Sequence, residues 1–597
     1  MNIEQSLNQV VTKAVEEIYA KTPAQGQVQV QKTKKEFEGD FTIVVFPLLK
    51  ISGQKPEETA NKIGEYIKAN WQEAQNFNVV KGFLNISVKK TAITETLKKI
   101  ASNENFGYTP ITEKSKKIVL EFSSPNTNKP LHLGHLRNNF LGDSISRILK
   151  AGGNNVIKVN LVNDRGIHIC KSMLAWQKFS GGETPESSGI KGDHLIGKYY
   201  VLFDKHYKQE VADLMAQGQT EDEAKKNAPI LLEARKMLQD WEKGVPEVVE
   251  LWKKMNGWVY DGFDVTYKTM GISFDKIYYE SKTYLEGKQY VIDALKKGIC
   301  QQADDKSVYI DLTADGLDQK ILLRSDGTTV YMTQDLGTAA LRHREFNFDE
   351  HIYVVGNEQD YHFKVLKLVL KKIGFDWADT IKHFSYGMVE LPDGKMKSRE
   401  GTVVDADDLI AEMTDTARQT SQELGKLNEM TAEEQTKTVE TIALAALKYF
   451  ILKVDPKKTI LFNPKESIDF NGNTGPFLLY TYARIRSIFR KLDEKNITRQ
   501  TLSDDFCDIA PAESELVKKL LDFPQAVSDA CSMCSPAQIA NYVYELSKQY
   551  NQFYHDFTII GETDNQKREF RIILSQTAGK VIKDCLNMLG INVLEKM

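Results

Sequence analysis

One stretch of the chain, residues 117–164, constrains the fold most because it predicts two buried strands joined by a helix. The apolar runs KIVLEF (117–122) and NVIKVNLVND (155–164) are typical of strands. Between them, residues 131–153 repeat apolar side chains at helical spacing and end at two glycines. Such a unit forms parallel strands with a right-handed crossover. It therefore predicts an α/β domain built on a parallel sheet.

The rest of the chain predicts further domains around this sheet. Its 597 residues correspond to about four domains of ordinary size. Residues 1–110 alternate helical patterns with short strands, which indicates a small α+β domain, and residues 190–260 indicate a charged helical insertion. Strands are expected again in KSVYIDL, TTVYMT, HIYVVG and HFSYGMVEL. From about residue 405 onward the pattern is helical only.

Charge and cysteine content narrow the class of protein. The formal net charge is −4, so any surface for nucleic acid must be a local basic patch. The N-terminus lacks the features of a signal peptide, and no apolar run approaches the ~18 residues of a membrane span. Six cysteines give no disulfide framework, and the Cys531–Cys534 pair is a weak zinc signal. We expect a reduced, cytoplasmic protein without structural zinc.

Glycine-rich nucleotide motifs are missing from the sheet domain. GxGxxG is absent, and a near miss to the phosphate-binding loop occurs at Gly192, Gly197 and Lys198. Tyr199 follows where a hydroxyl residue would bind magnesium, and no strand precedes the segment. We interpret this near miss as chance.

The remaining candidate is SSPNTNKPLHLGHLRN (123–138), in which His132 and His135 bracket Gly134. It opens the first helix after the first strand of the sheet, where free N–H groups bind phosphates. A glycine there would let a flat base lie against the helix backbone. The alternatives are a zinc site, for which no third ligand is evident, and a polar helix start with no chemistry.

This segment resembles the HIGH signature of class I aminoacyl-tRNA synthetases, in the form found in arginyl-tRNA synthetases. The second class I signature, KMSKS, is expected on a loop after the last strand, where DGKMKSREG (393–401) stands. The resemblance covers nearly the whole chain and includes GDFTIVVF, GFLNISV, the segment Asn163–Gly166 and FNGNTGPFLLYTYARIRSIFRK.

The resemblance implies a multidomain α/β fold with a role for each domain. Residues 1–110 would form an additional small α+β domain that contacts tRNA, and residues 111–405 a Rossmann-like catalytic domain with its helical insertion around 190–260. A helical connection (406–465) and an all-α anticodon-binding domain (466–597) would follow.

The activity implied is that of a class I arginine–tRNA ligase, which uses ATP with Mg²⁺, L-arginine and the cognate tRNA. Such enzymes form an aminoacyl-adenylate, release pyrophosphate and pass the acyl group to the terminal adenosine of tRNA. Neither step needs an enzyme nucleophile, because the barrier falls by positioning and charge neutralisation. We expect a monomer with no membrane partner and name no protein ligand for Mg²⁺.

Other functions stay open at this point. The alternatives are a lysine or glutamine ligase of the same class, a small-molecule adenylyltransferase that shares HxGH, and a non-enzymatic tRNA-binding paralogue. The flanking domains argue against the second. The intact signature residues argue against the third.

The resemblance also implies the residues of the ATP site. These are His132, Gly134, His135, Met388, Lys395 and Ser398. The usual KMSKS pattern has lysines at its first and fourth positions, whereas here Ser398 stands fourth. Lys129, three residues before His132 in a proline-restricted loop, is our candidate for the missing cation. We expect His132, His135, Lys129 and Lys395 to be catalytic, the alternative for both lysines being solvated loop charges.

For arginine itself, the family pocket has carboxylates that pair with the planar, permanently charged guanidinium. Matching residues are Glu280, Tyr331 and Asp335, with Asn126 and Gln359 at the amino or carboxylate end of the substrate. Taken singly, a turn Asp is usually a helix cap and a lone Glu a surface acid. A buried pocket whose carboxylates pair with a guanidinium would reject lysine, because bound lysine would leave carboxylates unpaired. No editing domain is therefore expected.

Two regions are candidates for tRNA contact. YARIRSIFRK (482–491) places Arg484, Arg486 and Arg490 among aromatic residues, which suits bases and phosphates. The alternative is an amphipathic helix with basic solvent positions. In the N-terminal domain, Phe37 and Phe41 are stacking candidates, although a buried Phe is the default.

Overall fold

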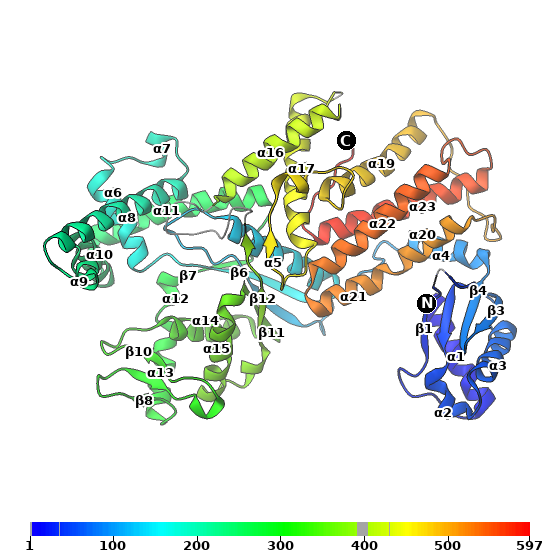
Figure 1. Cartoon of the computed structure of the whole chain (residues 1–597), viewed down its shortest axis with the longest axis horizontal. Coiled ribbons are helices and arrows are strands. Elements are labelled where there is room, and N and C mark those ends of the chain that lie inside the picture. Colours follow the sequence, from blue (N-terminus) through cyan, green and yellow to red (C-terminus); the bar gives the residue numbers. More distant parts are fainter. Residues whose placement is uncertain (1–2, 35, 391–403, 429) are drawn as a thin grey trace.

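A five-stranded parallel sheet lies at the centre of the computed structural model, which describes residues 3–34, 36–390, 404–428 and 430–597 (Figure 1). The strands are β5 (Lys117–Glu121), β6 (Asn155–Val162), β7 (Lys276–Tyr279), β11 (Glu350–Gly356) and β12 (Ile381–Tyr386). Their order is β12-β11-β5-β6-β7, and every neighbouring pair is parallel. The chain thus winds outward from β5 in both directions, and ligands bind such sheets at the carboxyl ends where the order reverses.

Helix α5 (Leu133–Ala151) joins β5 to β6, so the predicted strand–helix–strand unit is confirmed. Gly152 is its C-cap, as expected. Almost every residue of α5 is buried, because the sheet lies on one side and α16, α17 and α21–α23 pack on the other. The signature segment is therefore held between the sheet and the helical part of the chain.

Residues 163–275 form the helical insertion without a strand (Figure 1, teal, at left). Its helices are α6 (Ile167–Phe179), α7 (Pro185–Ser188), α8 (Gly192–Ala216), α9 (Glu221–Asn227), α10 (Pro229–Glu242) and α11 (Pro246–Met270). Gly192 and Gly197 lie inside α8, so the near miss to a phosphate-binding loop is chance, as we interpreted it. The two glycines lack a side chain where α8 packs closely, Gly192 against Trp258 and Gly197 against Pro130.

A second lobe lies between β7 and β12. It contains α12 (Glu280–Thr283), α13 (Glu286–Lys296), the antiparallel strands β8 (Gln301–Gln302), β9 (Val308–Ile310) and β10 (Lys320–Leu323), α14 (Tyr331–Phe346) and α15 (Asp360–Ile373). The expected strand TTVYMT (328–333) is wrong, because Val330 is the N-cap of α14 and Tyr331 its first residue. Packing of α14 on α13 overrides the β-branched residues before it.

The N-terminal domain has its own hydrophobic core, made of residues from Ile3 to Ala92. Its elements are α1 (Ile3–Tyr19), β1 (Gln29–Lys32), β2 (Phe41–Val44), α2 (Leu49–Ser52), α3 (Pro56–Asn70), β3 (Ala74–Val80) and β4 (Phe83–Val88), with sheet order β1-β2-β4-β3. The next helix, α4 (Lys90–Ser102), packs on α20 and α23 instead.

The C-terminal part is a bundle of helices. They are α16 (Ala406–Glu423), α17 (Ala432–Leu452), α18 (Pro464–Ser467), α19 (Gly475–Glu494), α20 (Pro511–Leu521), α21 (Phe523–Met533), α22 (Pro536–Asp556) and α23 (Asn565–Met588). The purely helical expectation is wrong for β14 (Ile460–Leu461), which pairs in parallel with β13 (Val389–Glu390). The domain limits at 110, 405 and 465 stay predictions.

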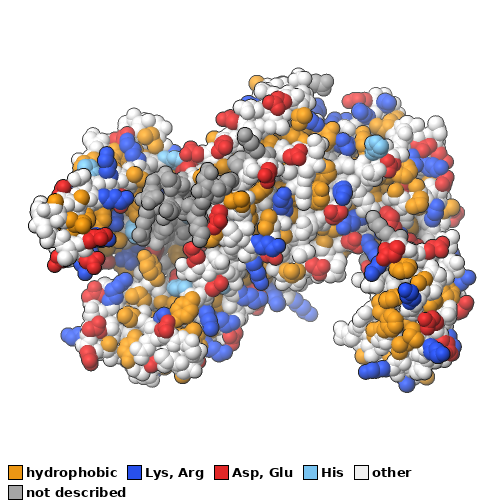
Figure 2. Space-filling model, viewed as in Figure 1, with side chains coloured by type: hydrophobic (Ala, Val, Ile, Leu, Met, Phe, Trp, Pro, Cys, Tyr) orange, Lys and Arg blue, Asp and Glu red, His pale blue; other side chains and the backbone are white. Residues whose placement is uncertain are grey.

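Ion pairs and hydrogen bonds fasten the N-terminal domain to this bundle. Lys32 Nζ lies 2.7 Å from Asp522 Oδ1 and donates to the Lys518 carbonyl at 2.7 Å. Lys518 in turn pairs with Asp40. Figure 2 shows the N-terminal lobe at lower right, separated by open space from the lobe at lower left.

Basic and acidic side chains are interspersed over every lobe on the face shown in Figure 2. This agrees with the small net charge of −4. Within the described residues, no helix is long and apolar enough to cross a membrane.

Candidate active site

The signature segment leaves the carboxyl end of β5 and pairs with a neighbour on each side. Asn126 bridges to Asn163 at the end of β6. His132 bridges to Asp405, and the Leu133 amide donates to the Val404 carbonyl at 3.0 Å. The segment is therefore held between β6 and the first turn of α16.

His132 and His135 form a pair at the start of α5. His132 is the N-cap, and its backbone N–H donates to His135 Nδ1 at 3.1 Å. The two ring centroids are 3.8 Å apart. Because His135 Nδ1 accepts, the neutral ring carries its proton on Nε2, which can donate to a ligand. His132 Nδ1 is buried and has no hydrogen-bond partner among the described residues.

Both histidines are neutral at physiological pH. Burial and the nearby Lys129 ammonium lower the pKa of His132 to about 3. Burial, with His132 and Lys129, holds the pKa of His135 well below its usual value. The imidazoles therefore offer N–H donors, and the positive charge of this segment lies on Lys129, whose own pKa burial lowers.

Met388 lies at the opposite wall, beyond the carboxyl end of β12. Its backbone carbonyl accepts from Arg137 Nη1 at 2.6 Å, and its sulfur lies beside Gly356 at the end of β11. Arg137 is 1% exposed and also donates to the Pro456 and Lys458 carbonyls. Sequence reasoning missed this arginine, which looked like an ordinary polar residue of α5.

Two residues of the predicted ATP site, Lys395 and Ser398, lie outside the described residues. The described chain reaches Glu390 in β13 and resumes at Val404 beside His132.

Two predicted carboxylates lie near each other at the same edge of the sheet. Glu280 is the first residue of α12, directly after β7, and is 9% exposed. Burial raises the pKa of Glu280 to about 7; the Arg165 charge opposes this shift, while Asp164 and Asp335 add to it. The alternative of a surface acid is therefore wrong for Glu280.

Asp335 lies in the second turn of α14, on one helix face with Tyr331 four residues before it. Because Val330 is the N-cap, the alternative that Asp335 caps the helix is wrong. Its Oδ2 lies 2.6 Å from His362 Nε2 on α15. Tyr331 is 66% exposed.

Gln359 and Asn126 complete the predicted arginine site. Gln359 is exposed, follows the carboxyl end of β11 and is the N-cap of α15. Asn126 is half-buried after β5. The loops that follow β5, β7 and β11 thus each contribute a candidate at one edge of the sheet.

Asp164 is a neighbour of this site to which sequence reasoning gave no role, although the Asn163–Gly166 segment was noticed. It is 1% exposed and accepts from the Ser281 amide at 2.8 Å, from Ser281 Oγ at 2.7 Å and from the Tyr260 hydroxyl at 2.8 Å. Because Ser281 follows Glu280, Asp164 fixes the backbone that carries the predicted carboxylate.

The predicted tRNA-binding arginines lie on α19. Arg484 donates to Asn551 Oδ1 at 2.6 Å, and its guanidinium lies over Tyr480 and Tyr554. Arg486 pairs with the Glu595 carboxylate at 2.6 Å, and Arg490 donates to the Glu595 carbonyl.

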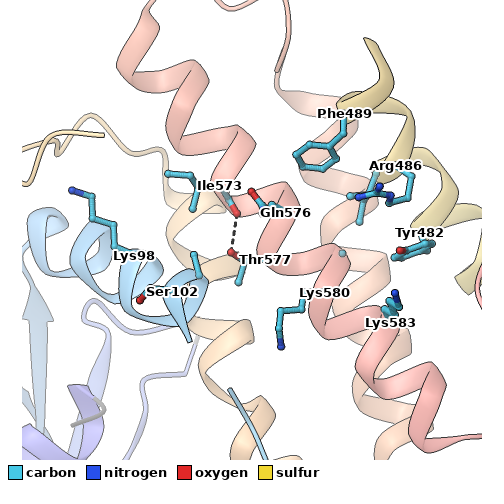
Figure 3. Close-up of a pocket in the computed structure, with 13 residues that line it drawn as sticks. Lys98, Ser102, Tyr482, Arg486, Phe489, Ile573, Gln576, Thr577, Lys580 and Lys583 are labelled. Atoms are coloured by element: carbon cyan, nitrogen blue, oxygen red, sulfur yellow. Dashed lines mark hydrogen bonds between the residues drawn. The ribbon is translucent and has the colours of Figure 1, made fainter. Parts of the chain in front are cut away.

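A cavity of about 530 Å³ opens between α4, α19 and α23 (Figure 3). Its basic lining residues are Lys98, Arg486, Lys580 and Lys583. Lys98 pairs with Asp504 and Lys580 with Asp584, so acidic neighbours offset much of the charge.

The two phenylalanines predicted to stack on tRNA differ. Phe37 is 43% exposed, which leaves its ring accessible. Phe41 is 1% exposed in the core of the N-terminal domain, so the prediction for Phe41 is wrong. Phe41 lies in β2 and belongs to the same hydrophobic cluster as Leu7 of α1 and Ile63 of α3.

One group of histidine and carboxylate side chains among the described residues has the spacing of a metal site. Ligand atoms of Asp193, His194 and Asp407 lie within 4.8 Å of one another. The Lys191 ammonium pairs with both carboxylates, so the group already holds a cation. It does not fit as the ligand set for Mg²⁺.

Three family models match the chain. They are the arginyl-tRNA synthetase N-terminal domain at residues 2–88, the class I (R) tRNA synthetase catalytic domain at 96–463 and the DALR anticodon-binding domain at 478–597.

Full-length relatives agree with these matches. The arginine–tRNA ligase of Bacteroides fragilis (strain YCH46) is 56% identical over 597 residues, with 100% of both chains covered. That of Flavobacterium psychrophilum is 54% identical over 609 residues, again with 100% of both. The fold is similar to that of Thermus thermophilus arginyl-tRNA synthetase, with a TM-score of 0.79, 22% identity and 100% of both chains covered. The chain belongs to the arginyl-tRNA synthetase family of class I aminoacyl-tRNA synthetases.

Proposed function

We propose that the protein is an arginine–tRNA ligase. It activates L-arginine with ATP to arginyl-adenylate and pyrophosphate, and then transfers arginine to the terminal adenosine of its cognate tRNA. The observation that carries the proposal is the shared sheet edge, where a histidine pair follows β5 and a buried carboxylate follows β7 in a chain of this family. A phosphate-binding end and a guanidinium-binding end are what arginine activation requires.

In the activation step, arginine's carboxylate attacks the α-phosphorus of ATP and pyrophosphate leaves. His132 and His135 donate N–H hydrogen bonds to the phosphates, because their low pKa values keep them neutral. Lys129 and Lys395 supply positive charge as negative charge develops on the leaving group. Mg²⁺ enters with ATP, and we assign it no protein ligand. Gly134, Met388 and Ser398 complete the proposed ATP contacts.

Arginine is recognised at its two ends. Glu280 and Asp335 pair with the guanidinium beside Tyr331, while Asn126 and Gln359 bind the amino acid head. A lysine ammonium cannot satisfy both carboxylates in fork geometry, so the pocket rejects lysine without a separate editing site.

The flanking domains bind the tRNA. Arg484, Arg486 and Arg490 of the C-terminal domain contact the anticodon region, and Phe37 of the N-terminal domain contacts the outer corner. The protein acts as a monomer in the cytoplasm; light scattering at micromolar concentration tests the first point and cell fractionation the second.

A charging assay tests the function. Purified protein, ATP, Mg²⁺ and total tRNA are incubated with each of the twenty amino acids, and acylated tRNA is measured. We expect charging with arginine alone. Charging with lysine or glutamine, or turnover of a small molecule without tRNA, would contradict the proposal.

A second expectation concerns the order of substrates. Arginyl enzymes resemble glutamyl and glutaminyl enzymes in usually needing tRNA before activation. We therefore predict that ATP–pyrophosphate exchange requires tRNA. The measurement is exchange after nuclease treatment, with intact tRNA added back as the control. Full exchange without RNA would show that this trait does not extend to this chain.

The arginine KM is expected to depend on pH through Glu280. Its pKa of about 7 means that the carboxyl is protonated below this pH and unable to pair with a guanidinium. The KM for arginine should therefore rise about tenfold per pH unit below 7 and level off above it. Glu280→Gln should raise the KM and remove this dependence, while the KM for ATP should not follow the same curve. An arginine KM that is flat from pH 5.5 to 8 contradicts the assignment.

A further inference from the structure

Helix α8 of the insertion lies against the signature segment and also contacts α16, the neighbour of that segment. A Cβ on Gly197 would lie 2.9 Å from Pro130 Cδ and 3.7 Å from Lys129 Cα. The N-terminal end of α8 reaches the other neighbour of the segment, the first turn of α16.

The contact with α16 is a network of ion pairs and hydrogen bonds. Lys191 pairs with Asp407 and donates to Thr266 Oγ1 on α11 at 2.6 Å. His194 Nε2 lies 3.0 Å from Asp407 Oδ2 and 3.6 Å from Asp405 Oδ2. Thr266 Oγ1 also donates to Asp407 Oδ1 at 2.9 Å.

The base of this network is rigid. Asp193, which pairs with Lys191 at 3.1 Å, is 0% exposed and lies against Gly262 of α11. A Cβ on Gly192 would lie 2.1 Å from the Trp258 carbonyl oxygen, so α8 and α11 approach each other at backbone distance. Lys191 is therefore presented to α16 from a fixed support.

The first turn of α16 is in turn joined to the signature segment by backbone contacts. The Asp405 carboxylate caps α16 by accepting from the Asp407 amide at 2.8 Å and the Asp408 amide at 3.2 Å. The same residue bridges to His132, and the Ala406 amide donates to the Leu131 carbonyl at 2.9 Å. A displacement of the first turn of α16 therefore displaces the backbone at His132.

We propose that Lys191 and His194 are positioning residues for ATP: through Asp405 and Asp407 they hold the first turn of α16, and with it the His132 backbone, at the place that the phosphates require. Gly197 sets the opposite side of the same segment at Lys129. The inference rests on the proposed function in one respect, namely that His132 and Lys129 bind ATP.

Protonation of His194 strengthens the contact of α8 with Asp405 and Asp407 at the first turn of α16. The groups that face it are Asp405 and Asp407 on α16 and Asp193 and Lys191 beside it on α8. The hydrogen bond to Asp407 is the largest cause that raises the pKa of His194, against burial. The ion pairs are therefore complete below the raised pKa and weaken as pH rises through it.

The test measures the ATP dissociation constant by calorimetry, and kcat and both KM values by tRNA-dependent ATP–pyrophosphate exchange, from pH 6 to 9. Lys191→Met should weaken ATP binding and lower kcat/KM for ATP about tenfold. The arginine KM should stay within about twofold, and Lys191→Arg should restore part of the loss. Thermal melting shows whether each variant is folded.

His194→Gln tests the positioning role through the pH dependence of kcat/KM for ATP, which a merely structural role would not change. At pH 6 the wild type should exceed this variant in kcat/KM for ATP by about fivefold, and at pH 9 the two should agree within about twofold. His206→Gln, on the same helix but stacked on Phe179, is the matched control and should follow the wild type at every pH.

Gly197→Ala tests the contact of α8 with Pro130 and Lys129 and changes no charge. It also tests the inference if Lys191→Met does not fold. It should weaken ATP binding, whereas Gly257→Ala in α11, where a Cβ meets nothing within 4 Å, should not. Wild-type ATP binding and kcat in folded Lys191→Met, His194→Gln and Gly197→Ala would overturn the inference. Tight ATP binding with no charging of arginine would instead refute the proposed function, and the dissociation constants would still test the positioning.

Discussion

Lys129→Ala is expected to lower kcat for arginine activation about 100-fold while leaving tRNA affinity nearly unchanged. A hydrogen bond to a charged group contributes ~1.5–3 kcal/mol, which corresponds to roughly 10- to 150-fold in rate. Lys129 is the cation that acts on both histidines, and burial lowers its own pKa. A solvated turn lysine, the alternative for this residue, would show neither property.

The measurement is pre-steady-state or exchange kinetics with tRNA binding followed separately. Lys114→Ala, at an exposed position before β5, is the matched control and should behave as wild type. Ser398→Lys restores the lysine of the usual signature and should partly rescue Lys129→Ala. If Lys129→Ala activates arginine at the wild-type rate, the cation comes from Lys397 or Arg399 instead.

Asp335→Asn is expected to raise the arginine KM about 10- to 100-fold with little effect on the KM for ATP. The substitution keeps the shape of the side chain and removes its charge, so the guanidinium loses a charge-assisted hydrogen bond. The loss should be partial, because His362 lies 2.6 Å from Asp335 Oδ2 and the amide can keep one contact with it. Discrimination between arginine and lysine should narrow, since fewer unpaired carboxylates penalise lysine.

Asp326→Asn serves as the control for this variant. Asp326 is exposed in the turn between β10 and α14, and its carboxylate accepts from Thr328 within the turn. Initial rates across arginine and lysine concentrations are the measurement. An unchanged arginine KM and kcat in Asp335→Asn would remove Asp335 from the pocket.

The sequence predicted those parts of the fold that are decided by local patterns. The unit from β5 to β6 was found because its apolar runs and terminal glycines lie next to one another in the chain. The helical pattern expected after about residue 405 is local in the same way, and on α23 the apolar residues Leu574, Val581 and Cys585 are fully buried. TTVYMT failed because packing of α14 on α13 decides its structure, and no local pattern records that contact.

Residues that act through distant partners could not be found in this way. His362 meets Asp335 across 27 residues, Lys191 meets Asp407 across 216, and Arg137 reaches Lys458 across 321. Each is an ordinary polar residue in its own window of sequence. The candidate site residues were named through the family resemblance, because only a known family links loops that follow different strands.

The pairing of the N-terminal domain with the far end of the chain has a consequence for synthesis on the ribosome. The domain has its own core, so it folds soon after its residues emerge. Its Lys32 can pair with Asp522 only after the ribosome has added another 490 residues. At ~5–20 residues per second this delay lasts roughly 25–100 s. Docking of the first domain is thus one of the last events in making the protein, and a nascent chain released before Asp522 lacks the ion-pair partner of Lys32.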